Sequence, residues 1–594
     1  MAIELINAKT KAGLDSALAS GSVKQTDLAL VRETGEEALH TQDKTYHFVP
    51  GGGHERQILA WDEDGKAKWD DLANMFTGLE ELLAYGVEWK ENVRDPIITR
   101  IGNMSLHKTL PIQSQLKGCI AQKDKVIYWL AEDDWRFRKD PIYMTVDLSN
   151  DVEHPNFGEA SIASLAVGQF VKAGTHIGKI AYIEGTNVTV EWEEDLSGIS
   201  AELTTITELE IGSRLDGYDG TVRVYCPNFY IKSQIIGDIR RVWLSTVKID
   251  NTWTYQHEIL IDAYRSTVLN AVPENMGYLS TLTVGCAISV VNTAAYCRGG
   301  GNRTGNDKYL TGADDTPIDI FRTDLGKPRT AMSRQTMRND ARAAGSEMLN
   351  YDQYKNIFYW LYVVEYANFN CQAAYNAELT DDGYHQGGLG ASITNMGNWN
   401  KYNGCYPITP CGYGNKLGNG TGLVPLTIPE FTYGADNTVK AAQTMQMARW
   451  RGFDNPFGDI WTNLDGIIID ADADNHPNNM NYVYTCQDPA KYADSLNDGY
   501  EKVGEEIHQD GYTKLFDLGD AAHIIPHVMG GNTTQFKCDY HWTGGKDTTL
   551  RTLLVGGDAS NGADAGLGYF NSYRGVSSSS TYFGFRSVSS FVSL

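Results

Sequence analysis

The sequence predicts a β-rich protein of the α+β class. The chain of 594 residues contains 60 glycines, 33 tyrosines and 13 tryptophans, a composition that favours many turns between strands with aromatic packing. Several segments alternate apolar and polar residues with a period of two, whereas helical spacing is confined to a few short segments. A chain of this length is expected to form two to four domains.

Residues 1–53 are predicted to form a small N-terminal module. Residues 9–19 suit a short helix, and short strands follow at 28–32, 37–40 and 46–49 before a break at Pro50 and three glycines. Such a module buries little surface by itself. We therefore expect it to dock on another protein.

A linker and an amphipathic helix are predicted within residues 54–85. Between Trp69 and Tyr85, helical spacing places apolar side chains on one face, namely Leu72, Met75, Phe76, Leu79, Leu82 and Leu83. The helix either packs on its own domain or forms a short self-association stem. With fewer than three heptads, the pattern does not separate the two.

The rest of the chain is predicted to be a β-rich body with one insertion. Residues 86–139 and 213–280 contain strand-like segments, and residues 281–594 form the C-terminal domain. The interruption at 140–212 has period-two segments separated by glycine turns, which is typical of a small inserted β-barrel. Within 339–374, an apolar stripe predicts a core helix, formed by Ile357, Leu361 and Val364.

Charge and composition exclude several classes of partner. The formal net charge of −25 argues against nucleic acid, because phosphate neutralisation needs clustered Lys and Arg. No segment predicts membrane insertion or a cleaved signal peptide. Nine scattered cysteines without a C-x-x-C pair fit thiols of a protein made in a reducing cytoplasm, although Cys405 and Cys411 are close enough to pair.

No motif predicts a metal site or a cofactor. Residues 470–475 imitate the start of a calcium loop, but Asn475 and Asn481 replace the required Gly and Glu. A solvated turn is the favoured interpretation, with an irregular calcium site as the minor alternative. His523 and His527 flank Pro526, which argues against a zinc-binding helix.

No motif predicts catalysis either. The glycine-rich run at 299–305 is followed by Asn306 and Asp307 where a phosphate loop needs Lys and then Ser or Thr. Glycoside hydrolysis needs only two well-placed carboxylates, and no pair stands out among 75 acidic residues. The sequence therefore favours a binding protein over an enzyme.

Residues 556–586 (GGDASNGADAGLGYFNSYRGVSSSSTYFGFR) differ most from the rest of the chain. They combine Gly, Ser and Asn with aromatic side chains, the residue types of binding loops. A flexible tail is the alternative, but a linker has no reason to carry the aromatics. We expect an ordered display surface whose loop positions contribute no core.

Two landmarks resemble the formylglycine-generating-enzyme branch of the C-type-lectin fold. Residues 450–466 (WRGFDNPFGDIWTNLDG) are similar to its turn-and-strand segment, and the terminal Gly584-Phe585-Arg586 resembles its closing motif. That enzyme activity needs a cysteine pair that has no match here, so the activity is not inherited with the fold. Trp461, Trp542 and Phe585 are expected to hold the scaffold, and Arg586 to form a buried ion pair with an acid such as Asp465.

With residues 106–119 and 215–232, the chain from about residue 85 onward resembles tail proteins of phages and prophages of gut Bacteroidales. In that family a C-terminal lectin-like domain displays a receptor-binding surface, often diversified by a diversity-generating retroelement. The resemblance implies recognition positions in the variable segment at Asp558, Ala559, Ser560, Asp564, Gly568, Tyr569, Tyr573, Arg574, Tyr582 and Phe583.

The function that follows from the resemblance is a tail-fibre adhesin of the virion. The C-terminal domain is expected to bind a glycan or protein receptor on the host surface, and the N-terminal module to bind other phage tail proteins. A homotrimer is expected, because multivalency makes weak binding firm. The alternatives are a tail spike that degrades capsule polysaccharide and a structural tail or collar subunit whose C-terminal domain binds another virion protein.

Overall fold

The structure is a computed structural model of the chain. It describes residues 79–149, 151–291, 294–302, 323–396, 407–433, 438–544 and 549–591, and before residue 79 it describes only the backbone of six strands. Strands predominate and helices are short, so the predicted β-rich class is confirmed. Within these described residues, no helix is long and apolar enough to cross a membrane.

The six N-terminal strands form one sheet in chain order. Its strands are β1 (Ile6–Ala8), β2 (Ala29–Glu33), β3 (Glu36–His40), β4 (Thr45–Phe48), β5 (Gln57–Trp61) and β6 (Ala67–Asp71). Strands β2, β3 and β4 match the three predicted strands, whereas the predicted helix at 9–19 lies outside the described residues. The sheet continues past residue 53 through β5 and β6.

The helix predicted between Trp69 and Tyr85 is confirmed at Leu79–Leu83 and wrong at both ends, whereas residues 72–78 lie outside the described residues. Strand β6 extends to Asp71, helix α3 covers only Leu79–Leu83, and strand β7 (Ala84–Lys90) begins directly after it. In β7, Tyr85 and Val87 are fully buried, and the whole strand pairs with β18. Strand pairing therefore overrides the helical spacing from Ala84 onward.

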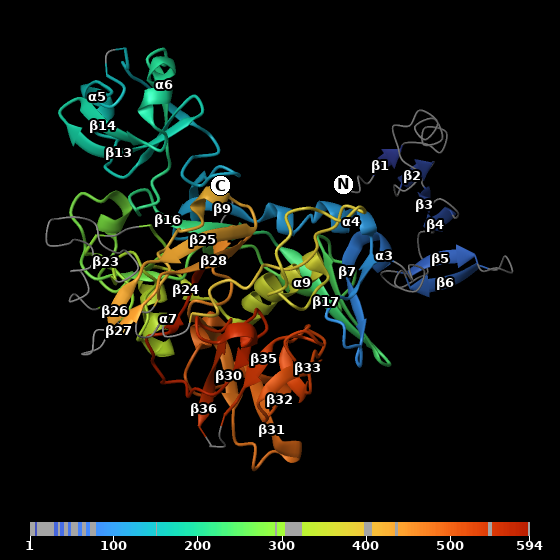
Figure 1. The fold of residues 1–594 in the computed structure, drawn as a ribbon. Helices are drawn as coiled ribbons and strands as arrows, with labels where there is room; N and C mark the ends of the chain where they lie inside the picture. The colour runs from blue at the N-terminus through green and yellow to red at the C-terminus, as the bar shows by residue number, and fades with distance from the viewer. Residues whose placement is uncertain are drawn as a thin grey trace.

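Two sheets form the body, and each combines strands from both sides of the insertion (Figure 1). The five-stranded sheet has the order β19-β17-β18-β7-β8, with β8 (Thr99–Gly102), β17 (Phe229–Ile236), β18 (Ile239–Ser245) and β19 (Thr254–Gln256). The six-stranded sheet has the order β10-β9-β16-β20-β39-β24, with β9 (Lys117–Gln122), β10 (Lys125–Trp129), β16 (Thr221–Cys226), β20 (Ile259–Asp262), β24 (Glu347–Met348) and β39 (Ser587–Ser590). Two short helices, α4 (Met104–Thr109) and η1 (Gln113–Gln115), precede β9.

The insertion folds around a core of its own and forms a separate lobe in Figure 1. Its sheet has the order β11-β15-β12-β13-β14, with β11 (Ile142–Thr145), β12 (Phe170–Ala173), β13 (His176–Glu184), β14 (Asn187–Trp192) and β15 (Glu208–Ile211), beside helices α5 (Glu159–Ile162) and α6 (Leu196–Leu203). Isolated bridges join Asn156 to both Asp147 and Asn187, so the sheet is nearly closed. In β14 the side chains of Val188 and Val190 point into this core, as period-two alternation predicts.

One continuous helical segment runs through the main core. It consists of α8 (Tyr351–Gln353), a π-helix η5 (Tyr354–Trp360) and α9 (Leu361–Tyr366). The predicted stripe of Ile357, Leu361 and Val364 is fully buried, which confirms a core helix. The sequence does not indicate the π-helical turn, a feature that is frequent at functional sites. Helix α7 (Arg334–Ala343) precedes this segment.

A nine-stranded sheet forms the C-terminal part, drawn in orange and red in Figure 1. Its order is β32-β31-β30-β36-β37-β35-β33-β34, with β38 paired to β30. The strands are β30 (Trp461–Asp470), β31 (Met480–Cys486), β32 (Tyr500–Ile507), β33 (Gly511–Asp517), β34 (Ile525–Met529), β35 (Tyr540–Trp542), β36 (Leu550–Val555), β37 (Phe570–Asn571) and β38 (Phe583–Gly584).

Three smaller sheets complete the described structure. They contain β21 (Thr267–Leu269), β22 (Ala287–Ile288) and β23 (Cys297–Arg298), then β25 (Gly422–Ile428), β28 (Gln443–Trp450) and β29 (Phe453–Asp454), and finally β26 (Phe431–Tyr433) and β27 (Thr438–Lys440). Short 3-10 turns lie at η2 (Gly277–Thr281), η7 (Asn415–Leu417), η8 (Pro477–Asn479), η9 (Pro489–Lys491) and η10 (Gly562–Asp564). Cys411 is a buried free thiol, and Cys405 lies outside the described residues.

Candidate functional site

The terminal segment, residues 556–586, is an ordered part of the fold. Strand β37 lies between β36 and β35, and β38 pairs in parallel with β30. The chain then crosses into the six-stranded body sheet, where β39 pairs with β20 and β24. The ordered interpretation is therefore confirmed, and the flexible-tail alternative is wrong.

Arg586 fixes the end of the segment through backbone carbonyls. Its guanidinium donates to the carbonyl oxygens of Asp262 at 2.9 Å and Ala263 at 2.7 Å, and also to that of Asp454. The predicted ion pair with Asp465 is wrong, because Asp465 is paired with Arg338. The planar fork of Arg suits several fixed acceptors at once, which here are carbonyl groups.

Five of the predicted recognition positions are buried: Asp558, Ala559, Gly568, Tyr569 and Phe583. Their side chains form no part of the exposed surface, and the expectation that loop positions contribute no core is wrong for them. At Gly568 a Cβ would lie 2.3 Å from Asp539 Oδ2, so no side chain fits. Glycine and small residues here allow close approach between strands, a use that composition alone does not reveal.

Asp558 has a structural role. Its carboxylate accepts hydrogen bonds from Trp461 Nε1 at 3.0 Å and from the backbone and hydroxyl of Ser560. Burial raises the pKa of Asp558 above its ordinary value. The carboxylate thus ties the loop to the buried indole of β30.

The other five predicted positions reach the surface. Ser560 is exposed, and Asp564, Tyr573, Arg574 and Tyr582 are half-buried. Arg574 donates to the hydroxyl of Tyr582 at 3.0 Å and lies over the ring of Tyr573, 4.8 Å from its centroid. The structure therefore brings Tyr573, Arg574 and Tyr582 into one contiguous group.

Neighbouring strands extend this group into a larger surface, called the aromatic face here. It consists of five half-buried ring side chains, Tyr512, Tyr540, Trp542, Tyr573 and Tyr582. Tyr540, Trp542 and Tyr582 pack on one buried cluster that contains Trp461, Tyr569 and Phe583.

Ring contacts hold the aromatic face rigid. Trp542 stacks on Tyr573 with ring centroids 4.8 Å apart and an interplanar angle of 11°. Tyr512 and Tyr540 meet edge to face at 5.1 Å, and Tyr540 meets buried Tyr569 in the same way at 5.7 Å. Pairs of this geometry contribute about 0.5–1.5 kcal/mol beyond area burial.

Polar groups are placed among the rings. The hydroxyl of Tyr512 donates to Asp564, and the exposed Asp510 accepts the backbone N–H groups of Thr543 and Gly544. With the guanidinium of Arg574, the face offers two carboxylates and one cation beside flat apolar rings. Such a surface can bind a ligand that presents both hydroxyl or amide groups and an apolar side.

The buried polar groups beneath the aromatic face hold strands together. Buried Glu506 accepts hydrogen bonds from the Ser572 hydroxyl and from Asn481 Nδ2, and its Oε1 lies 3.1 Å from His541 Nε2. Because the hydroxyl donates to the carboxylate and not to the imidazole, this trio lacks the serine–histidine contact that activates a nucleophile. The hydrogen bond to Glu506 holds Ser572, the residue after β37, against β32.

Among the described residues, no group of three or more His, Cys, Asp or Glu side chains could hold a metal ion. In the calcium-like run, the side chain of Asn475 donates to Asp472 within a turn. The two histidines considered for zinc also lie in separate settings, since His523 stacks on Tyr351 whereas His527 Nδ1 lies 3.2 Å from the carbonyl oxygen of Glu505.

Sequence reasoning missed Tyr512 and Tyr540 and assigned Trp542 to the scaffold. A signal was available for two of them, since Tyr540 and Trp542 are two residues apart and therefore share one face of a strand, with the intervening His541 buried on the other. Tyr512 joins them through the pairing of β33 with β35, a long-range contact that local patterns do not encode. The Gly/Asn/Tyr-rich run at 383–422 is predicted to form an ordered loop system by Trp399, Tyr402, Tyr406 and Tyr413. Tyr413 is half-buried in the structure, and the other three lie outside the described residues.

Comparison with protein-family models, with curated proteins and with solved structures finds no match to this chain.

Proposed function

We propose that this protein is a tail-fibre adhesin that attaches a phage virion to a receptor on the host cell surface. In this proposal the C-terminal part is a C-type-lectin-like domain that binds the receptor through the aromatic face. The N-terminal module joins the fibre to other tail proteins, and the fibre is a homotrimer.

The aromatic face is the observation that carries the proposal. Rigid tyrosine and tryptophan rings provide large contact area at little entropic cost, and such residues dominate the energetics of binding surfaces. Five of the ten positions implied by the family resemblance reach the surface there or beside it. The scaffold strands below them are well packed, so loop residues can vary without loss of the fold.

Binding to whole cells tests the proposal. Labelled full-length protein is incubated with a panel of Bacteroidales strains, and bound protein is measured by flow cytometry. We expect saturable binding to a subset of strains. Exchanging Ser560, Asp564, Tyr573, Arg574 and Tyr582 for other residues should change which strains are bound.

A matched control uses two exposed tyrosines of the insertion, Tyr143 and Tyr182. Their replacement by alanine removes exposed rings outside the aromatic face and should leave strain preference unchanged. An unchanged strain preference after the five-position exchange would refute the receptor-site assignment. Release of oligosaccharide from host capsule would favour the depolymerising spike, and particle images with this domain packed on other virion proteins would favour the structural subunit.

The trimer is tested separately by sedimentation equilibrium of the full chain. Three chains of 65.7 kDa are expected in the particle at micromolar concentration. A trimer presents three aromatic faces to the cell, so that a weak single contact gives firm attachment. A monomer at all concentrations would contradict this part of the proposal.

A further inference from the structure

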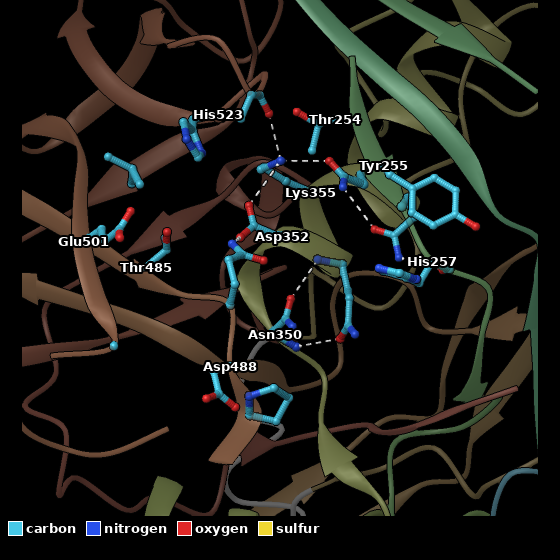
Figure 2. A pocket seen from close by; sticks show the side chains of 18 of the residues that line it. Thr254, Tyr255, His257, Asn350, Asp352, Lys355, Thr485, Asp488, Glu501 and His523 are labelled. Carbon is cyan, nitrogen blue, oxygen red and sulfur yellow. Dashed lines mark hydrogen bonds and ion pairs between the residues drawn. The ribbon is translucent and has the colours of Figure 1, made fainter. Parts of the chain in front are cut away.

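A second candidate site lies away from the aromatic face, in a polar cavity between the body and the C-terminal sheet. The cavity has a volume of about 670 Å³. Figure 2 shows that its wall is formed by strand β19, by the start of the central helical segment, and by residues of β31 and β32. Volumes of this order are typical of small-molecule pockets.

The π-helical turn places a lysine in the wall of this cavity. Lys355 is only 1% exposed, and its ammonium donates to Asn356 Oδ1 and to the carbonyl oxygen of Ala521, both at 2.8 Å. Asp352 Oδ1 lies 3.2 Å from the same nitrogen. Burial lowers the pKa of Lys355, and the Asp352 carboxylate opposes that shift. A buried ammonium is costly to desolvate, and these three polar partners offset that cost.

His523 beside it has a ring nitrogen without a partner. The imidazole is 6% exposed, lines the cavity and stacks on Tyr351. Its Nδ1 makes no hydrogen bond within the described structure. Burial lowers the pKa of His523 to about 4, so the ring is neutral. An unpaired buried polar atom costs about 1–3 kcal/mol, and the protein retains this cost beside the cavity.

The lining identifies the chemical class of the ligand. Uncharged polar side chains with amide or hydroxyl groups line much of the cavity, among them Gln256, Asn350, Asn356, Thr485 and Gln487. Each of these groups can both donate and accept hydrogen bonds, as sugar hydroxyls do. The charged lining residues are two lysines, Lys355 and Lys491, against four carboxylates, Asp352, Asp488, Asp498 and Glu501. The excess of two negative charges disfavours an anionic ligand.

A second cavity adjoins the first, which favours an extended ligand. The second cavity has a volume of about 710 Å³ and shares five lining residues with the first, Tyr255, His257, Asn350, Gln353 and Pro489. Between the two cavities, the exposed ring of Tyr255 meets His257 edge to face at 4.6 Å. A flat ring between two polar hollows suits a chain of sugar rings, whose faces are apolar and whose edges carry hydroxyls.

We infer that these two adjoining cavities bind an uncharged oligosaccharide, with one sugar ring seated against Lys355, Asp352 and His523. The site is separate from the aromatic face, and this inference does not rest on the proposed receptor contact.

Soluble oligosaccharides test this site directly. Full-length protein is titrated with neutral oligosaccharides of glucose, galactose, mannose and N-acetylglucosamine, and with sulfated counterparts, by saturation-transfer NMR and calorimetry. Thr254 is exposed at the edge of β19 and lines the cavity, so Thr254→Trp narrows the site without touching a buried group. Thr207→Trp, at an exposed threonine of the insertion, is the matched control.

We expect at least one neutral oligosaccharide to bind at millimolar concentration or below. Thr254→Trp should weaken that binding at least about tenfold, whereas Thr207→Trp leaves it unchanged. Thr485→Val keeps the shape and removes one hydroxyl, so it should weaken binding about three- to tenfold. In protein labelled with ¹⁵N-histidine, the Nδ1 resonance of His523 should shift on binding.

The inference fails if no neutral oligosaccharide binds, if sulfated chains bind more tightly than neutral ones, or if Thr254→Trp and Thr207→Trp bind alike. It also fails if binding occurs while the His523 resonance stays unchanged. None of these results bears on the aromatic face, whose test uses whole cells and different variants.

Discussion

The indole of Trp542 stacks on the phenol ring of Tyr573, with centroids 4.8 Å apart and planes 11° from parallel. The two residues come from different parts of the chain, since Trp542 ends β35 and Tyr573 follows β37. Gly544 leaves room for this stack, because a Cβ on it would lie 1.8 Å from the Tyr573 ring. The aromatic face is therefore built before any ligand arrives, which lowers the entropic cost of binding.

Trp542→Ala should weaken binding to cells strongly. The change removes one of the two stacked rings and leaves Tyr573 without support, and central aromatic anchors contribute at least about 2 kcal/mol, roughly thirtyfold in affinity. Flow cytometry with labelled full-length protein measures the effect, with Tyr182→Ala as the control for loss of an exposed ring. Equal binding by Trp542→Ala and the unchanged protein would show that the face is not the contact.

Gly568→Ala should destabilise the protein although it adds one methyl group. The new Cβ would lie 2.3 Å from Asp539 Oδ2 and 2.7 Å from the ring of Tyr359, and overpacking of this kind costs about 1–3 kcal/mol. The matched control is Gly198→Ala in α6, where a Cβ meets nothing within 4 Å and helix propensity improves. Calorimetry should show a lower melting temperature for the first variant only, and an unshifted melting temperature for Gly568→Ala would contradict the close packing.

The insertion and the terminal segment differ in how far the sequence predicts their structure. The insertion is predictable because Val188, Val190 and Trp192 alternate towards a core formed within residues 146–211. The packing of residues 556–586 is predictable only in part, because Gly566 and Gly568 pack against Asp539, a contact between separate segments that leaves no local pattern. The same limit applies at Ala84, where strand β7 replaces the predicted helix, since the partner strand β18 lies about 150 residues later in the chain.

Asp539→Asn should raise stability at neutral pH. Burial raises the pKa of Asp539 well above its ordinary 3.8, and a hydrogen bond from the backbone of Gly568 opposes this shift only in part. Because the pKa of Asp539 is raised in the folded state, its favourable contribution to the free energy of unfolding is fully present below pH 3.8. This contribution is lost as the pH rises towards the folded-state pKa. The amide of the Asp539→Asn variant does not ionise, so the variant keeps its stability as the pH rises.

Melting temperatures measured across the acidic and neutral range test this sign. The gain from Asp539→Asn should be largest at neutral pH and should shrink as the pH falls towards 3.8. Asp510→Asn, at an exposed carboxylate of the aromatic face, is the comparison at a solvated site. A lower melting temperature for Asp539→Asn at neutral pH would mean that the buried group is stabilised as a carboxylate.

Arg338→Met should be among the most damaging single changes in the C-terminal part. Arg338 Nε and one terminal nitrogen reach the two oxygens of Asp465 at 2.6 and 2.8 Å, and both side chains are buried. Removing one partner leaves the other charge buried without compensation, at a cost of about 3–5 kcal/mol. The same change at Arg342, which pairs with Glu347 nearer the surface, should cost about 0–1 kcal/mol. Calorimetry of both variants decides the matter, because equal losses would mean that the buried pair contributes no more than the exposed one.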